Sequence, residues 1–478
     1  MMKSMLAFLA AALLAGTASA ATMPPPGPMP PAANRALAVS IFRDIVNIRS
    51  VHAVGTKQVA AVIEKYLVAG GFTPSEISVV SEKKAPWQVN LVVRLKGKGP
   101  KSQTNKPVMW ICHMDVVDAK PEDWTMPPFK FTEKGGYFYG RGTSDMKDED
   151  SAVGASLIRL KQEHYVPDRD IIVAFTADEE VGLDQDGPEY LLKNDPALVN
   201  AGVVMNPDGG SGEILDGKRL DFAVETAQKT YMTFKMETAN KGGHSSEPRP
   251  DNAIYELAQG LVRLSHYRFP FKTNATTRGY FAELAKRASG EQQADLTALS
   301  KLPLDPAAAE RASQDVAMNA ILHTTCVATM LNAGVQENAL PSRADATIQC
   351  RAFPDESIAS VQEALQQAVA DPGIAVSLME EVVKGPETVP DPAVMAKIGK
   401  VVESMWPGTP VLTEMAAGAS DSLYTRNAGI PSYGVGGGWN DLGDLRMHGR
   451  DERHEVNDYY TTVEFTYRLM KEMTGKSQ

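Results

Sequence analysis

The sequence has only three cysteines in 478 residues, and positive charge is in deficit. Three cysteines are too few for the cross-linked framework of a small disulfide-rich protein. With 48 lysines and arginines against 59 aspartates and glutamates, the formal net charge is −11. This balance argues against nucleic acid or an anionic membrane as the main partner. A hydrophobic content of 43% in a chain of this length predicts two cores.

Long apolar runs are also missing, apart from a short one at the N-terminus. Lys3 precedes an apolar stretch at residues 5–14 that is too short to span a bilayer, and Ala18-Ser19-Ala20 has the small side chains of a cleavage site. We therefore expect residues 1–20 to be a signal peptide, with a buried helix as the alternative. The mature protein would begin at Ala21, be periplasmic or secreted, and carry no membrane anchor. The proline-rich residues 21–33 predict an extended linker.

Strand-like and helix-like segments alternate from about residue 34 to about residue 208, which is typical of an α/β sheet with helices on its faces. From about residue 224 the order changes to strand, helix, strand, strand, as expected of a small α+β domain with an antiparallel sheet. Between these strands, residues 266–318 are helical and polar, and the sequence assigns them no role.

Two adjacent carboxylates, Glu179 and Glu180, follow an apolar strand-like segment at residues 171–176. One carboxylate of such a pair can bind a metal while its neighbour stays free as a base. By itself the pair is weak evidence, because adjacent glutamates at the end of an element are usually a solvated surface feature. The interpretation therefore depends on the rest of the chain.

Other potential ligands occupy equivalent places. His113 and Asp115 follow the apolar run at residues 108–112, and their spacing of two would make them face the same way. There, Asp115 would accept the second N–H of a metal-bound His113 imidazole. Three more candidates lie after a strand or beside a helix, namely Asp145, Asp208 and His448. Because ligands bind at the carboxyl ends of strands in open α/β sheets, we expect all of them to converge.

Three carboxylates and two imidazoles form a mixed set of oxygen and nitrogen ligands. Such a set suits zinc, since it lacks soft thiolates and is not the oxygen-only shell expected for calcium or magnesium. Five ligands with one shared carboxylate would serve two ions. A lone histidine after a strand is more often a hydrogen-bonded core residue than a ligand. The joint order of the five therefore predicts the metal centre.

That order comprises the motifs His-x-Asp, Gly-Arg-Gly-x-x-Asp-Met-Lys, Glu-Glu, Asp and His-Gly-x-x-Glu. It resembles the dinuclear zinc exopeptidase and aminoacylase family, which includes succinyl-diaminopimelate desuccinylase, glutamate carboxypeptidase and carnosine dipeptidase. The resemblance covers about residues 35–470. It implies a catalytic domain at residues 34–223 and 383–478, with a mixed, mostly parallel sheet flanked by helices. It also implies an inserted α+β lid at residues 224–382, through which a homodimer could form.

The resemblance assigns roles to the candidate residues. Glu179 would be the general base, and the peptide bond between Asp145 and Met146 would be cis. Two Zn²⁺ ions, for which Co²⁺ or Mn²⁺ could substitute, would be held by His113 with Asp208, by Glu180 with His448, and by Asp145 as the bridge. The chain departs from the family at Asp148, where glycine is usual. His454 is a second histidine nearby, but only His448 stands in the matching His-Gly-x-x-Glu frame.

Two lid motifs match the family as well. Gly243-His244-Ser245 resembles the motif whose histidine stabilises the tetrahedral oxyanion, often from the partner subunit of a dimer. Asn338 and Arg351 resemble the pair that binds the terminal carboxylate of the substrate. Alternatively, Arg351 pairs with a protein carboxylate and His244 only caps a turn.

The two lid cysteines, Cys326 and Cys350, lie on neighbouring strand-like segments, in a register centred on Asn338. They could form a cross-strand disulfide or remain free buried thiols.

Together these features predict a zinc-dependent exopeptidase, either a carboxypeptidase or a dipeptidase, that hydrolyses an amide bond next to a free carboxylate. A hydroxide bridging the metals would attack, with Glu179 as the general base. Export favours peptides as substrates, and an N-acyl-amino-acid deacylase is the alternative. A catalytically inactive peptide-binding protein is a remote third possibility, against which Glu179 and the complete ligand set argue.

Overall fold

The computed structural model describes residues 24–98, 104–181 and 186–475, so the expected signal peptide at residues 1–20 lies outside the described residues. The described chain divides into two compact units. The large unit contains residues 24–226, 388–414 and 420–475, apart from the gaps given above. The inserted unit contains residues 227–387 and 415–419. None of the described helices is long and apolar enough to cross a membrane.

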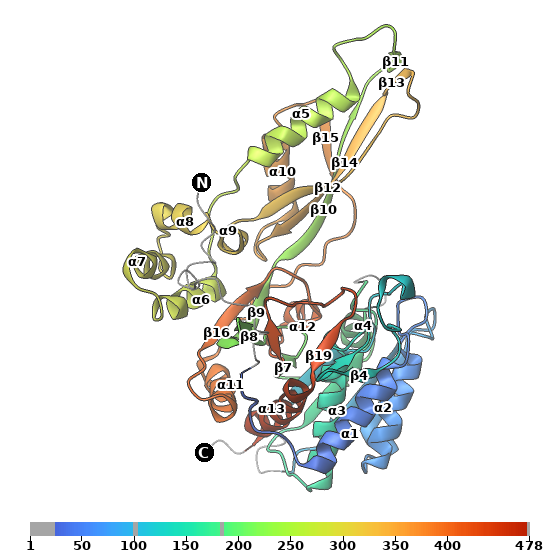
Figure 1. Ribbon diagram of the computed structural model, residues 1–478, viewed down its shortest axis with the longest axis vertical. Helices are drawn as coiled ribbons and strands as arrows, with labels where there is room; N and C mark the ends of the chain where they lie inside the picture. Colours follow the sequence, from blue (N-terminus) through green and yellow to red (C-terminus); the bar gives the residue numbers. More distant parts are fainter. Residues whose placement is uncertain (1–23, 99–103, 182–185, 476–478) are drawn as a thin grey trace. The chain divides into compact units, whose positions relative to one another are not determined.

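A ten-stranded mixed sheet forms the centre of the large unit (Figure 1). Its strand order is β1-β2-β6-β3-β7-β17-β9-β8-β18, and β16 pairs with β9. Central strands β6, β3, β7 and β17 run parallel, whereas β1, β2 and β6 pair in antiparallel fashion, as do β17, β9 and β8. The strands are β1 (Ile77–Ser81), β2 (Val89–Leu95), β3 (Val108–His113), β6 (Ile171–Thr176), β7 (Val203–Asn206), β8 (Gly212–Leu215), β9 (Lys218–Gln228), β16 (Val411–Ala416), β17 (Ser432–Gly434) and β18 (Trp439–Asp441).

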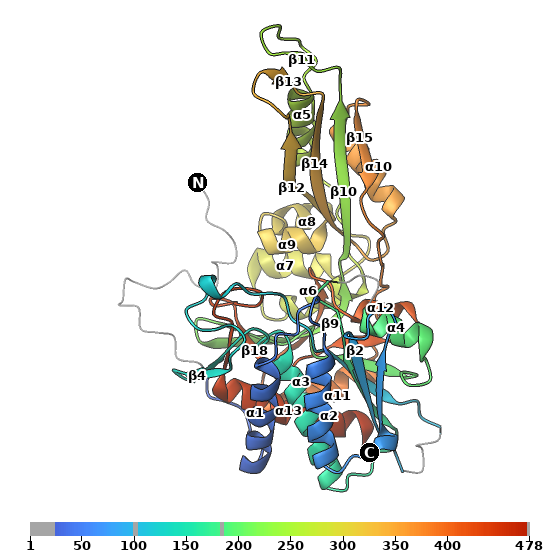
Figure 2. The same ribbon diagram turned by 90° about the vertical axis from the view of Figure 1, so that its right-hand side faces the viewer.

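Helices cover both faces of this sheet, which explains why its central strands are continuous apolar runs. On β3, Trp110 and Cys112 belong to the core shared with one helix layer, while Met109 and Ile111 belong to a second core on the opposite face. The first layer consists of α1 (Ala32–Val46), α2 (Lys57–Ala69), α3 (Lys147–Gln162), α11 (Pro392–Met405) and α13 (Val456–Thr474), seen together in Figure 2. The other face carries α4 (Gly187–Asn194), which contacts α12 (Ser422–Asn427).

A small three-stranded sheet lies in the same unit, in the order β19-β5-β4. Its strands are β4 (Thr132–Lys134), β5 (Tyr137–Tyr139) and β19 (Arg453–Glu455). The sheet joins a segment just before the Gly-Arg-Gly motif to the segment just after the His-Gly-x-x-Glu motif, because β5 pairs with β19. Two motifs that lie far apart in the sequence are thereby held near each other.

The inserted unit contains a four-stranded antiparallel sheet in the order β12-β14-β10-β15. Alternate residues such as Met232, Phe234 and Ile348 form a core with Leu257 and Leu365 of two helices. The elements are β10 (Thr230–Ala239), β12 (Thr325–Ala333), β14 (Arg343–Ala352), β15 (Ile374–Leu378), α5 (Ala253–His266) and α10 (Ile358–Val369). A separate two-stranded pair is formed by β11 (Gly243–His244) and β13 (Ala339–Leu340). The fold expected for this insertion, an antiparallel sheet with helices, is confirmed.

The polar stretch without an assigned role forms four short helices. They are α6 (Ala275–Ala285), α7 (Gly290–Leu299), α8 (Pro306–Ala312) and α9 (Val316–Leu322). The helices pack around a core of their own that includes Phe281 and Leu299, both fully buried. This stretch is therefore a helical subdomain of the inserted unit and not a loop.

Candidate metal centre

Five of the sequence-predicted residues form two overlapping groups in the large unit. His113, Asp145 and Asp208 make one group, and Asp145, Glu180 and His448 make the other. Within each group, one ligand atom from every residue lies within 4.8 Å of the others. His113 Nε2 is 3.1 Å from Asp145 Oδ1, and His448 Nε2 is 2.9 Å from both Asp145 Oδ2 and Glu180 Oε2. The two oxygens of Asp145 thus face different groups.

Strand order explains this convergence. His113 ends β3, while Glu180 and Asp208 follow its two parallel neighbours, β6 and β7. The carboxyl ends of adjacent parallel strands lie on one edge of a sheet, which is where open α/β proteins bind ligands. Asp145 arrives from the loop before α3, and its peptide bond to Met146 is cis, as the resemblance implies.

The charges of these groups fit divalent cations. Three carboxylates crowd around two imidazoles, and the His113 Nε2 atom is buried without a well-formed hydrogen bond among the described residues. Hydrogen bonds with Asp145 and Glu180 raise the pKa of His448 to about 10. Burial alone would raise the pKa of Asp145, but the close imidazoles of His113 and His448 lower it below its usual range. A metal ion would supply the positive charge that this set of oxygen and nitrogen atoms attracts.

Asp115 does not make the contact expected of it. Its carboxylate Oδ1 is 3.7 Å from His113 Nδ1, beyond hydrogen-bond distance, and the ring nitrogen lies closer to the Asp115 backbone oxygen, at 3.2 Å. The carboxylate instead accepts the backbone N–H groups of Glu179 and Glu180, at 3.2 and 3.1 Å. Asp115 therefore orients the turn that carries both glutamates, while its backbone fixes the imidazole.

Glu179 belongs to neither ligand group among the described residues. Burial raises the pKa of its carboxyl group well above the usual value, and the negative charge of Asp208 raises it further. A carboxylate in such surroundings is a better proton acceptor than one in water. Glu179 thus stands beside the ligands with the properties of a base.

The turn before Glu179 depends on residues that the sequence did not single out. Asp178 has a left-handed backbone conformation, with φ of 69°. Its buried carboxylate lies 2.6 Å from His52 Nδ1 and accepts a 2.9 Å hydrogen bond from Gln88. These contacts pin the residue that directs Glu179 and Glu180 toward the strand edge.

A buried ion pair joins the two motifs that flank the centre. Arg141 Nη1 lies 2.5 Å from Glu452 Oε2, and Arg141 Nη2 donates to the backbone oxygen of His448 at 3.2 Å. The other carboxylate oxygen of Glu452 accepts the Ser144 N–H at 2.8 Å. Arg141 belongs to the Gly-Arg-Gly-x-x-Asp-Met-Lys motif and Glu452 to the His-Gly-x-x-Glu motif. The two motifs are therefore the sequence signal for this ion pair, which supports Asp145 and His448.

The departure at Asp148 has a structural partner in the other histidine. Asp148 Oδ2 lies 2.8 Å from His454 Nδ1, and His454 Nε2 lies 3.0 Å from Asp458 Oδ2. Although burial opposes protonation, these two carboxylates raise the pKa of His454 well above its usual value. His454 therefore fastens α3 to α13 and is not a member of either ligand group.

Within the inserted unit, His244 and Asn338 come together. His244 pairs with Ala339 across β11 and β13, and the Ser245 N–H donates to the Asn338 oxygen at 3.1 Å. Both residues are exposed, and His244 Nδ1 lies 2.7 Å from the Ser246 hydroxyl and 3.2 Å from the Ser246 backbone nitrogen, whose N–H donates to it.

Arg351 lies elsewhere in this unit. The eight positions that separate it from Arg343, where β14 begins beside the β11–β13 pair, span roughly 27 Å. Its guanidinium carbon lies 4.7 Å from the centre of the Tyr231 ring, and within the described part of the chain it forms no ion pair with a carboxylate. A single copy thus does not bring Arg351 and Asn338 to one substrate carboxylate.

An α/β sheet with two overlapping His/Asp/Glu groups at its edge and a free glutamate beside them defines a metal-dependent hydrolase. Residues 109–472 match the peptidase family M20/M25/M40, and the chain belongs to this family. It is accordingly a metal-dependent peptidase or amidohydrolase.

Three similar proteins illustrate the range of the family. The N-fatty-acyl-amino acid synthase/hydrolase PM20D1.1 of Danio rerio is 27% identical over 381 residues, which cover 77% of this chain and 72% of that protein. An M20 family metallo-carboxypeptidase from Sulfolobus solfataricus has a similar structure, with a TM-score of 0.65 at 18% identity, covering 91% of this chain and 98% of the other. A dinuclear metal-binding M20 peptidase from Bacillus subtilis gives a TM-score of 0.56 at 12% identity, covering 93% and 99%.

Proposed function

We propose that this protein hydrolyses an amide bond whose amine side carries a free carboxylate, using two zinc ions. The observation that carries the proposal is the pair of ligand groups that share Asp145, with Glu179 beside them and outside both. His113 and Asp208 would hold one ion, Glu180 and His448 the other. Zinc suits this mixture of imidazole and carboxylate ligands, and Co²⁺ or Mn²⁺ could substitute.

Glu179 is the residue that moves protons in this proposal. Two bound divalent ions would polarise the substrate carbonyl and make a water molecule acidic. Glu179 takes the proton of the attacking water and delivers it to the nitrogen of the leaving amine. Asp115 keeps Glu179 in place through its hydrogen bond to the Glu179 backbone.

The inserted unit supplies substrate contacts in this proposal. Arg351 would bind the carboxylate of the substrate, and His244 would stabilise the oxyanion that forms on the carbonyl. Because Arg351 lies near the end of β14 and His244 lies in the separate β11–β13 pair beside the start of that strand, we propose that His244 and Asn338 act in the site of a second copy. The resulting homodimer would form through the inserted unit.

An exposed edge strand supports that dimer. β12 is at the edge of its sheet, and the side chains of Val327, Met330 and Leu331 on it are exposed by 57%, 68% and 66%. A long apolar edge strand is a template for pairing with another strand. A second copy of the chain, adding strand to strand, would cover these side chains.

The reaction has two candidate substrate classes, peptides with a free C-terminus and N-acyl amino acids. Peptides remain our first candidate because export suits scavenging of peptides. N-acyl amino acids are the second, and the similarity to an N-fatty-acyl-amino acid synthase/hydrolase favours them. The two classes share an amide bond next to a free carboxylate and differ in the group on the acyl side.

One experiment tests the reaction and separates these classes. The purified protein, with zinc added, is incubated with dipeptides, tripeptides and N-acyl amino acids, each in a free-acid and a carboxamide form, and products are followed by mass spectrometry. We expect cleavage of free acids and at least a hundredfold slower cleavage of carboxamides. Equal cleavage of both forms would contradict the role given to Arg351, and no cleavage of any substrate would contradict the reaction.

We also propose that the protein acts in the periplasm or outside the cell. The disulfide between Cys326 and Cys350 supports this location, since such bonds persist in oxidising compartments. N-terminal sequencing of the protein from its native host should begin at Ala21. A chain recovered from the cytoplasm with Met1 intact would contradict the proposal.

A further inference from the structure

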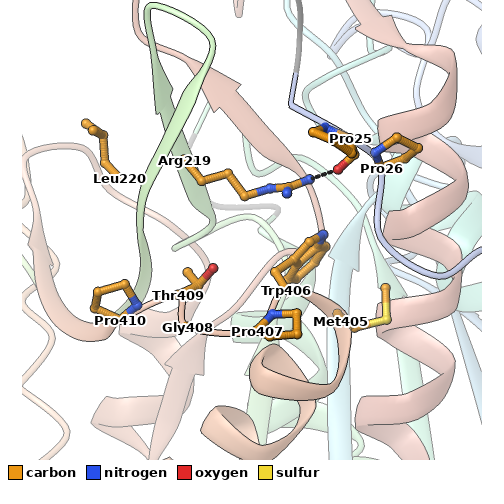
Figure 3. Close-up of a pocket in the computed structure, with 10 residues that line it drawn as sticks. All are labelled: Pro25, Pro26, Arg219, Leu220, Met405, Trp406, Pro407, Gly408, Thr409 and Pro410. Atoms are coloured by element: carbon orange, nitrogen blue, oxygen red, sulfur yellow. Dashed lines mark hydrogen bonds between the residues drawn. The ribbon is translucent and has the colours of Figure 1, made fainter.

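A hollow of about 450 Å³ lies on the large unit, away from any residue of the metal centre. Its walls come from Arg219 on β9 and from Met405, Trp406 and Pro407 at the end of α11 (Figure 3). Pro25 and Pro26, from the segment expected to be an extended linker, form the remaining side. The proline-rich segment therefore lies against the protein surface.

Specific contacts hold the segment at the side of the hollow. Arg219 Nη2 donates a 2.8 Å hydrogen bond to the Pro25 backbone oxygen, drawn as the dashed line in Figure 3. The Arg219 guanidinium carbon lies 4.7 Å from the ring centre of Trp439 and 5.9 Å from that of Trp406, so two indoles support the arginine. Such cation–π contacts stabilise the guanidinium in the position from which it donates.

Gly27 makes the closest approach. A Cβ atom at this position would lie 2.7 Å from Trp406 Nε1 and 3.1 Å from the Met405 backbone oxygen. The first distance is shorter than side-chain contacts allow. Neither neighbouring atom can easily move away, because Trp406 Nε1 belongs to a buried indole and the Met405 oxygen belongs to the main chain. Only glycine therefore fits where the segment passes Trp406.

The hydrogen-bonding character of the hollow matches a proline-rich chain. Prolines have no N–H, so an extended run of them offers carbonyl acceptors and almost no donors. One donor beside the hollow, Arg219 Nη2, bonds to the Pro25 oxygen, whereas the buried Arg219 Nε and Trp406 Nε1 have no hydrogen-bond partner in the described part of the chain even with residues 24–30 in place. Aromatic grooves that present such donors recognise extended proline-rich segments in other proteins.

We propose that Arg219, Met405 and Trp406 at the edge of this hollow form a docking groove for an extended proline-rich segment, and that the occupant of the groove is residues 24–30 of the same chain, which close one side of the hollow. The segment is anchored twice, because Pro25 bonds to Arg219 and Pro30 is buried just before α1 begins at Ala32. It works as a strap that ties the start of α1 to the end of α11. None of the groove residues is a metal-centre residue, so the strap affects cohesion of the unit and leaves the reaction unchanged.

A mobility measurement in the intact chain tests the strap. Pro28 is exposed, and a cysteine placed there can be spin-labelled selectively, because Cys112 is buried and the other two cysteines are joined. We expect an immobilised spectrum for the labelled protein. Gly27→Ala or Arg219→Ala, each added to it, should release the label, whereas Lys218→Ala at the exposed neighbouring position should not. A label that is freely mobile in the protein with Gly27 and Arg219 intact would overturn the proposal.

Binding in trans gives an independent test. A protein that starts at Pro31 is titrated with a fluorescent peptide of residues 21–30, and anisotropy is recorded. We expect saturable binding that Gly27→Ala in the peptide, or Arg219→Ala in the protein, weakens at least tenfold, while Lys218→Ala leaves it within twofold. Equal affinity of the glycine and alanine peptides would overturn the assigned groove. If the shortened protein does not fold, the spin-label measurement still decides the question.

Discussion

Cys326 and Cys350 lie directly opposite each other on β12 and β14, and a disulfide joins them. The bond ties the exposed edge strand of the inserted unit to the strand beside it. The third cysteine, Cys112, is buried in β3 of the large unit. The sequence was compatible with either a disulfide or two free thiols. The register of β12 and β14 favours the disulfide, because it places the two cysteines opposite each other.

This pairing predicts the thiol count. Alkylation under denaturing conditions should label one thiol without reductant and three with reductant, as read by intact mass. The two cysteines are 24 residues apart, and a loop of this size predicts that Cys326→Ser together with Cys350→Ser lowers the free energy of unfolding by about 3 kcal/mol. Three labelled thiols without reductant would show that the bond is absent.

Glu179 and Glu180 are neighbours with different expected roles, and conservative variants separate them. In Glu179→Gln both metal ions should remain bound while kcat falls by roughly two to four orders of magnitude, the usual contribution of a positioned general base. In Glu180→Gln metal content and activity should fall together, since an anionic ligand is lost, and excess zinc should restore part of both. Metal analysis beside kinetics gives the answer. A Glu179→Gln protein that loses metal would contradict the assignment of the base.

Mixed dimers test whether His244 acts in the site of the partner. His244→Ala and Glu179→Gln proteins should each be nearly inactive. In a mixed dimer, the subunit that retains Glu179 would meet an intact His244 from its partner, so one site in two would work. Random exchange of equal amounts should therefore restore about a quarter of normal activity. As a control, each variant taken through the same exchange alone should recover no activity. If the mixture of the two variants also recovers no activity, His244 acts in the site of its own chain.

Much of the candidate site could be predicted because it follows from strand ends. The run from Val108 to Cys112 is apolar throughout, which is typical of a strand buried on both faces, so the position of His113 at its end follows. The same reasoning places Glu180 and Asp208 just after two other apolar strands, β6 and β7, which are the parallel neighbours of β3. Local pattern and the order of the motifs were sufficient for these residues.

Contacts made across long stretches of sequence could not be predicted. His52 contacts Asp178, although the two residues are 126 positions apart in the sequence, and no pattern near either residue indicates this contact. Asn338 and Arg351 are close in sequence and suggest one binding pair, but β14 carries Arg351 to the far end of its sheet. Likewise, a proline-rich composition predicts an extended conformation correctly and says nothing of the surface on which that conformation lies.

A buried lysine in the inserted unit predicts how stability depends on pH. Lys229 is only 3% exposed, its Nζ donates to the His323 backbone oxygen, and it lies 4.2 Å from the centre of the Phe353 ring. Burial lowers the pKa of Lys229 from 10.5 to about 7. Between these two values the unfolded chain binds more protons than the folded one, so the folded state gains stability as pH rises.

We therefore expect the free energy of unfolding of the inserted unit to rise by roughly 2 kcal/mol between pH 7 and pH 9 through this residue. Lys229→Met removes the titrating group, so the rise in the free energy of unfolding between the two pH values should be smaller by that amount. The variant also loses the hydrogen bond to the His323 carbonyl, which lowers its stability at both pH values and does not affect the difference between them. Lys241→Met, at an exposed lysine of the same unit, is the control and should keep the full rise. Urea titrations at both pH values measure the difference, and an equal rise in Lys229→Met and the unaltered protein would show that Lys229 stays charged in the folded state.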